Sequence, residues 1–101
     1  MTDRELLELA AKACGLEEAK MRIEFNQWNP LTDDGDALRL AVKLRLDTGF
    51  EKLHTVCVWS VPLDKWITEQ CEIGNGMGKG IEGLTRRAIV RAAAEIGRSM
   101  K

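Results

Sequence analysis

An acidic cluster, Asp33-Asp34-Gly35-Asp36, is the first group of residues whose types and spacing could support chemistry. Carboxylate oxygens are the ligands that hard cations prefer in proteins. The spacing is not that of a calcium-binding EF-hand loop, because no glutamate stands at the twelfth position. Aspartates in turns also accept hydrogen bonds from nearby backbone amides. A solvated turn is therefore the favoured interpretation, and we expect no metal ion and no cofactor.

The single histidine, His54, stands three residues before Cys57, a spacing that also occurs in zinc sites. On a strand this offset places the two side chains on opposite faces, which argues against both a zinc pair and a nucleophile–base pair. The other cysteines, Cys14 and Cys71, are far away in the sequence. Three widely spaced cysteines favour free thiols in a reducing cytosol. With one histidine there is little room for conventional acid–base catalysis, and we expect the protein not to be an enzyme.

The glycine-rich segment 74–80 is a candidate anion site. Its backbone N–H groups could cradle a phosphate or nucleotide, with added charge from one lysine and two arginines. The segment is not a P-loop, because glycine rather than Ser or Thr follows its Gly-Lys pair. A mobile connector is favoured, and binding of a small anionic ligand stays an alternative. The residues of this candidate site are Gly76, Gly78, Lys79, Arg86 and Arg87.

A second alternative is nucleic-acid binding through Arg39, Lys43 and Arg45, which alternate with leucine and valine and would form a basic row on one sheet face. The formal net charge of −1 gives no overall basic field. The predicted element order is that of the double-stranded-RNA-binding domain, but the successive lysines of that module are absent. Solvated arginines paired with carboxylates are favoured, and nucleic acid is an unlikely partner.

The segment 37–46 is predicted to be the strand that organises the fold. Its leucines and Val42 alternate with basic residues and alanine, which is the period-2 pattern of a half-buried strand. A helix is predicted over 3–14, with Thr2 as its N-cap and Gly15 as its left-handed end.

The remaining elements complete a single domain of residues 1–101. We predict strands at 21–25 and 52–61, a weaker strand at 66–71, a turn at 47–49 and a helix over 84–99. Arg91 and Glu95 are expected to form an ion pair on that helix. The fold class is α+β, in the order α-β-β-β(-β)-α. Short connections imply an antiparallel sheet of three or four strands, packed with two helices. The alternation favours both helices on one face of the sheet, but whether they cover one face or both stays open.

Three stretches together resemble the phage ABA sandwich family, small proteins of bacteriophages and prophages. They are residues 28–44 (WNPLTDDGDALRLAVKL), 85–97 (TRRAIVRAAAEIG) and 6–13 (LLELAAKA). The resemblance implies a phage gene product with an α/β/α-type sandwich, and it implies no activity. Residues 47–84 lie outside the resemblance.

The expected function is that of a non-enzymatic accessory protein that binds a host or phage protein in the bacterial cytoplasm. No window reaches the roughly 18 apolar residues that a membrane span needs, and the amino terminus does not read as a signal peptide. Trp28, Trp59 and Trp66 either complete the core or form an interaction patch. If Trp59 lies on the sheet face away from the helices, we expect a homodimer.

Overall fold

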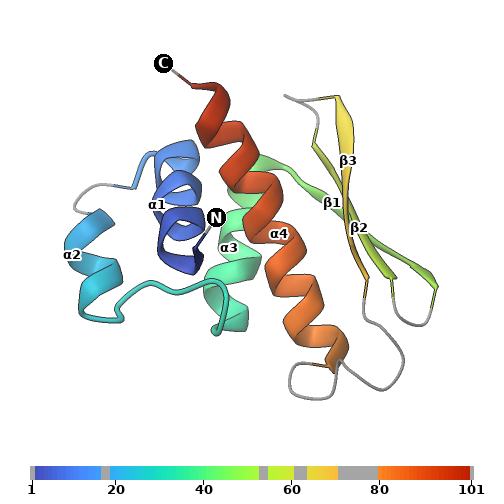
Figure 1. Cartoon of the computed structure of the whole chain (residues 1–101), viewed down its shortest axis with the longest axis horizontal. Coiled ribbons are helices and arrows are strands. Elements are labelled where there is room, and N and C mark those ends of the chain that lie inside the picture. Colours follow the sequence, from blue (N-terminus) through green and yellow to red (C-terminus); the bar gives the residue numbers. More distant parts are fainter. Residues whose placement is uncertain (1, 17–18, 53–54, 61–63, 71–79, 101) are drawn as a thin grey trace.

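The computed structural model describes residues 2–16, 19–52, 55–60, 64–70 and 80–100. Within these ranges the sheet is antiparallel, with strand order β1-β2-β3, and helices precede and follow it (Figure 1). The α+β class with a three-stranded antiparallel sheet is therefore confirmed. The elements are α1 (Asp3–Cys14), α2 (Ala19–Glu24), α3 (Asp34–Leu44), β1 (Asp47–Lys52), β2 (Thr55–Ser60), β3 (Lys65–Gln70) and α4 (Gly80–Ser99).

Helix α1 has the predicted bounds and the predicted ends. The Thr2 hydroxyl accepts a hydrogen bond from the Glu5 backbone N–H at 3.1 Å and donates one to the Glu5 carboxylate. Gly15 adopts the left-handed conformation with φ 70°, and the N–H of Leu16 bonds back to the carbonyl of Ala11 at 3.0 Å. These contacts satisfy backbone groups that a helix end would otherwise leave unpaired.

The predicted strand at 37–46 is wrong, because residues 34–44 form helix α3. Asp33 caps this helix by accepting a hydrogen bond from the Asp36 backbone N–H at 2.8 Å. The buried residues are Ala37, Leu40 and Ala41, which have helical spacing. Most residues of the segment are also good helix formers. The apparent alternation arises because this buried stripe is interleaved with further apolar residues on another face of the same helix.

Two other predicted elements are wrong, and three are present with shifted bounds. The predicted strand at 21–25 is wrong, because this segment forms helix α2, and the predicted turn at 47–49 is wrong, because it opens strand β1. The strands predicted at 52–61 and 66–71 correspond to β2 and β3, and the last helix begins at Gly80 rather than at residue 84.

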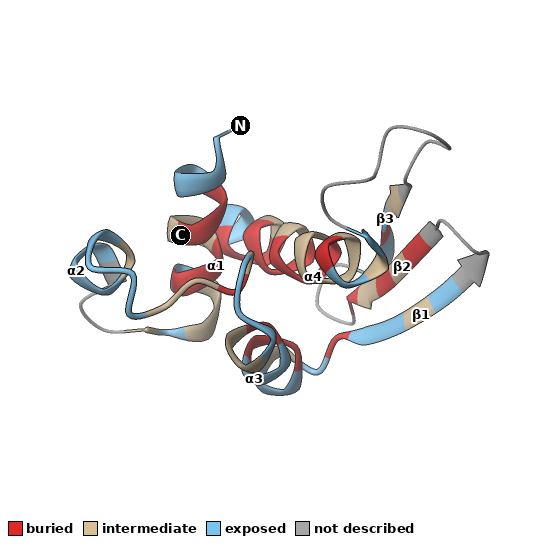
Figure 2. Cartoon of the chain, turned by 90° about the horizontal axis from the view of Figure 1, so that it is seen from below, coloured by how far each residue is buried: buried red, intermediate tan, exposed pale blue. Residues whose placement is uncertain are grey.

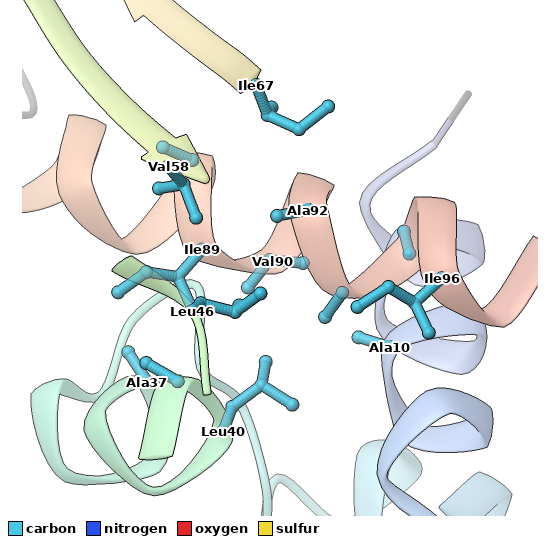
Figure 3. Close-up of a cluster of buried hydrophobic side chains, with 14 of the residues drawn as sticks. Ala10, Ala37, Leu40, Leu46, Val58, Ile67, Ile89, Val90, Ala92 and Ile96 are labelled. Carbon is cyan, nitrogen blue, oxygen red and sulfur yellow. The ribbon is translucent and has the colours of Figure 1, made fainter. Parts of the chain in front are cut away.

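Helix α4 is the centre of the molecule. It contacts α1 and α3 on one side and strands β2 and β3 on the other (Figure 1). Figure 3 shows Val58 and Ile67 from the sheet, and Ala10 and Leu40 from the helices, directed toward α4 from these two sides. Small residues let α4 approach both layers closely; its buried residues are Gly83, Ala88, Ile89, Val90, Ala92, Ala93, Ala94, Ile96 and Gly97.

The sheet has one covered face. Val56 and Val58 are fully buried against α4, and the described helices all lie on that side of the sheet (Figure 2). Trp59 and Trp66 are opposite each other in the β2–β3 register, and their ring centroids are 5.2 Å apart. Because side chains alternate along a strand, this tryptophan pair lies on the face away from α4.

Candidate functional site

Helix α3 carries more apolar residues than the core uses. Its buried stripe is Ala37, Leu40 and Ala41. Leu38 and Val42 are one helical turn apart and lie outside that stripe, with 65% and 67% of their surface exposed. Two large apolar side chains that face water one helical turn apart make this face of α3 a candidate contact surface for another molecule.

Strand β1 contributes a third exposed apolar side chain beside this helix. Phe50 is 64% exposed. It lies opposite Val56 in the β1–β2 register, on the sheet face that the helices cover, and it also lines a hollow with Cys57 and Trp66 of the open face. Phe50 and Leu38 line two adjoining hollows, of about 600 and 300 Å³, that also share Thr85 and Ile89 of α4.

We call this continuous depression the α3–β1 groove. Its exposed apolar side chains are Leu38, Val42 and Phe50, and the buried Leu46 and Ile89 also line it. Of the two threonines in the wall, Thr85 donates its hydroxyl hydrogen bond to the carbonyl of Ile81 at 2.7 Å, whereas Thr48 is exposed. The middle of the groove is therefore mainly apolar, with the Thr48 hydroxyl as an exposed polar group.

The two ends of the α3–β1 groove carry charged side chains. Arg45 and Asp47 line the end where α3 passes into β1. Asp34, Glu82 and Arg86 line the end where α3 and α4 begin. Arg45 and Glu82 form no ion pair with any residue in the described ranges, so each is available to a molecule in the groove.

Each aspartate of the acidic cluster, residues 33–36, makes contacts that hold the local structure. Asp36 accepts hydrogen bonds from the backbone N–H of Asn29 at 2.9 Å and from Arg39 at 2.6 Å. Asp33 caps α3, and Asp34 pairs with Arg86 at 2.5 Å. In the part of the chain that the structure describes, no group of three or more His, Cys, Asp or Glu side chains is placed to hold a metal ion.

Only two residues of the candidate anion site, Arg86 and Arg87, lie within the described ranges. Gly76, Gly78 and Lys79 lie outside the described residues. Arg86 donates to the carbonyl of Leu31 at 2.9 Å as well as pairing with Asp34, so it fastens the loop before α3 to α4. Arg87 is held between two carboxylates, one in α1 and one in β3: Asp3 at 3.2 Å and Glu69 at 3.3 Å. Both arginines are thus already paired with carboxylates of this chain.

The expected ion pair between Arg91 and Glu95 is wrong. Arg91 pairs instead with Glu69 at 3.1 Å, across the packing of α4 on β3. Glu95 lies 3.7 Å from both Lys65 and Arg98. Arg91 also donates a hydrogen bond to the carbonyl of Thr68, so the sheet determines its position.

The expected basic row on a sheet face is also wrong. Arg39 and Lys43 lie on helix α3, and Arg45 ends that helix in the left-handed conformation with φ 54°. Arg39 is paired with Asp36 and is 3.9 Å from Asp33. Because α3 is a helix, these three side chains do not form the continuous strip of charge that the strand prediction required.

The cysteines and histidine are not gathered at one site within the described ranges. His54 and Cys71 lie outside those ranges. Cys14 is part-buried at the end of α1, and this burial raises the pKa of its thiol. Cys57 lies on the open sheet face with its sulfur 3.8 Å from the Thr68 hydroxyl. A raised thiol pKa is the opposite of what a cysteine nucleophile needs.

Comparisons with protein-family models, with curated proteins and with solved structures found no match. The resemblance to the phage ABA sandwich family stays a prediction. No described helix has the length and apolar character that crossing a membrane would require. Sequence reasoning missed Leu38, Val42 and Phe50 as site residues, although the segment 37–46 held more large apolar residues than one helix stripe can bury.

Proposed function

We propose that this protein is a small, non-enzymatic binding module that holds an apolar segment of another polypeptide chain in the α3–β1 groove. The observation that carries the proposal is the exposure of Leu38, Val42 and Phe50 around one continuous groove. Following the family resemblance, we further propose a phage-encoded accessory protein that acts on a host or phage protein in the bacterial cytoplasm.

Folding leaves most of the apolar surface of these three side chains exposed to water. Fully burying a leucine, valine or phenylalanine side chain stabilises a protein by about 1.5–3 kcal/mol. Because each of the three side chains keeps roughly two-thirds of its surface in water, a partner that covers them gains about 3–6 kcal/mol in total. That gain is large enough to offset a substantial part of the entropic cost of association.

The chemistry of the groove supports binding rather than catalysis. Its middle is lined by leucine, isoleucine and phenylalanine, and the hydroxyl of Thr85 is engaged within α4. A surface of this kind recognises shape and apolar area, as grooves that accept an amphipathic helix or strand do.

A photo-reactive amino acid placed at Val42 tests the proposal in bacterial cells. Irradiation should join the protein to a partner, and Leu38→Glu in the same chain should abolish the product by placing a charge in the groove. Met21 is the matched control position, because it is also apolar and is 54% exposed, but lies on α2. No product at Val42, an equal product at Met21, or a product that survives Leu38→Glu would refute the proposal.

A further inference from the structure

We infer that the segment held in the α3–β1 groove is the same groove of a second copy of this chain, so that the protein is a twofold-symmetric homodimer. The inference rests on the proposed function and names its partner. A surface that binds itself about a twofold axis must be complementary to itself after a half turn. The charges at the two ends of the groove meet that condition.

Arg45 at one end and Glu82 at the other are unpaired charges of opposite sign, and the carboxylate of Asp47, beside Arg45, also forms no ion pair in the described ranges. Arg45 is positive at the end where α3 passes into β1, and Glu82 is negative at the end where α4 begins. Helix α3 has 11 residues and connects these ends, which separates them by about 16 Å (Figure 1). A half turn about an axis through the middle of the groove exchanges the ends, so Arg45 of each copy meets Glu82 of the other.

A second pair of charges follows the same symmetry. Asp47 lies at the Arg45 end, and Arg86 lies at the Glu82 end. The half turn therefore also brings the carboxylate of Asp47 toward the guanidinium of Arg86 in the other copy; because Arg86 already pairs with Asp34 of its own chain, this contact contributes less than the Arg45–Glu82 contact. Each end then places a cation against an anion, which is the complementarity that selects one orientation of association.

The positions of the exposed apolar residues of α3 are compatible with the same twofold axis. Leu38 and Val42 are four residues apart on one face of α3. In an antiparallel pair of α3 helices, Leu38 of one copy packs against Val42 of the other, and the contact repeats by symmetry. Phe50 lines the same groove and closes the side that faces the sheet.

The available area suits a small stable dimer. Each of the three side chains offers on the order of 100 Å² of apolar surface, so one copy supplies about 300 Å². A standard interface buries about 800 Å² on each partner, of which roughly 56–65% is apolar. Three side chains thus provide more than half of the required apolar area, and the groove walls adjoin them.

Charge reversal with sedimentation equilibrium tests the inference. The wild type should have the mass of two chains. Arg45→Glu and Glu82→Arg should each weaken self-association at least tenfold, because each places like charges together at both ends. An equimolar mixture of the two variants should recover the dimer, because a mixed pair restores opposite charges at both ends. Recovery also demonstrates that both variants are folded.

Each other outcome overturns the inference in an identifiable way. A wild type that stays at the mass of one chain excludes the homodimer. A wild-type dimer that neither reversal weakens uses another surface, and Trp66→Ala then tests the open sheet face. Variants that lose the dimer and do not recover it on mixing exclude the twofold pairing. If the Val42 photo-product contains a different protein, the proposed function stands without the homodimer; if there is no product, both fail.

Discussion

Replacement of Gly97 by alanine tests the packing at the centre of the fold. Gly97 lies near the end of α4, where that helix crosses α1. A Cβ atom added at this position would lie 2.0 Å from the carbonyl oxygen of Leu9 and 2.8 Å from its carbonyl carbon. Both atoms belong to the main chain of α1, so no side-chain rotation relieves the overlap, and one helix must move by more than an ångström.

The expected loss of stability is the difference between two effects. Forcing an extra carbon into a packed interior costs about 1–3 kcal/mol, and a main-chain clash belongs at the upper end of that range. Alanine is favoured over glycine within a helix by at most about 1 kcal/mol. The net destabilisation is therefore about 2 kcal/mol, which corresponds to a fall in Tm of about 8–16 °C for a domain of this size.

Thermal and urea unfolding followed by circular dichroism measure this change. Gly35→Ala is the matched control, because Gly35 also lies in a helix and its nearest neighbours are the side-chain ends of Asp33 and Arg39 at 3.2–3.3 Å. The Asp33 oxygen is the atom that caps α3, but it needs to move by only a few tenths of an ångström, so the cap persists and the control should unfold within a few degrees of the wild type. A Gly97→Ala protein as stable as the wild type would refute the close approach of α4 to α1.

The remaining predictions concern single contacts. Arg86→Ala should lower the free energy of unfolding by about 1–2 kcal/mol, because it removes the hydrogen bond to the Leu31 carbonyl. Asp34→Ala should lower it by less than about 0.5 kcal/mol, because the Asp34 carboxylate is 79% exposed. Equal losses for the two variants in urea unfolding would contradict this. Thr2→Ala should cost about 1 kcal/mol through the lost cap, and an unchanged urea midpoint would exclude it. Since burial raises the pKa of Cys14, iodoacetamide at neutral pH should alkylate it more slowly in the folded protein than in urea, as peptide mass spectrometry can measure.

The elements with local signals could be predicted from the sequence. Helix α1 has a capping residue, a capping glutamate and a terminal glycine, and its bounds were correct. Strand β2 is a short run rich in β-branched and aromatic residues, and β3 contains Trp66, Ile67 and Thr68. Helix α4 is rich in alanine with a helical apolar stripe. In each case local preference and tertiary packing agree.

The strand prediction for segment 37–46 is wrong, and the candidate site was missed, for the same reason. Leu38 and Val42 fit a strand pattern only if they are buried on the same face as Leu40. In the structure Leu40 packs in the core, and Leu38 and Val42 face solvent. Periodicity predicts secondary structure only when every apolar residue of a segment packs in the core, and the exposed Leu38 and Val42 do not meet that condition. The groove could not be predicted either, because α3, β1 and α4 form it only after folding.

A scan of the photo-reactive amino acid over four exposed apolar positions tests the role of the α3–β1 groove most directly. Leu38 and Val42 lie at the groove, Met21 on α2, and Trp66 on the open sheet face. We predict partner products from the first two positions and none from the other two in cells; the purified protein should give the same products if the partner is a second copy of this chain. Products from Trp66 or Met21 in the absence of products from Leu38 and Val42 would contradict the assignment of the groove as the binding surface.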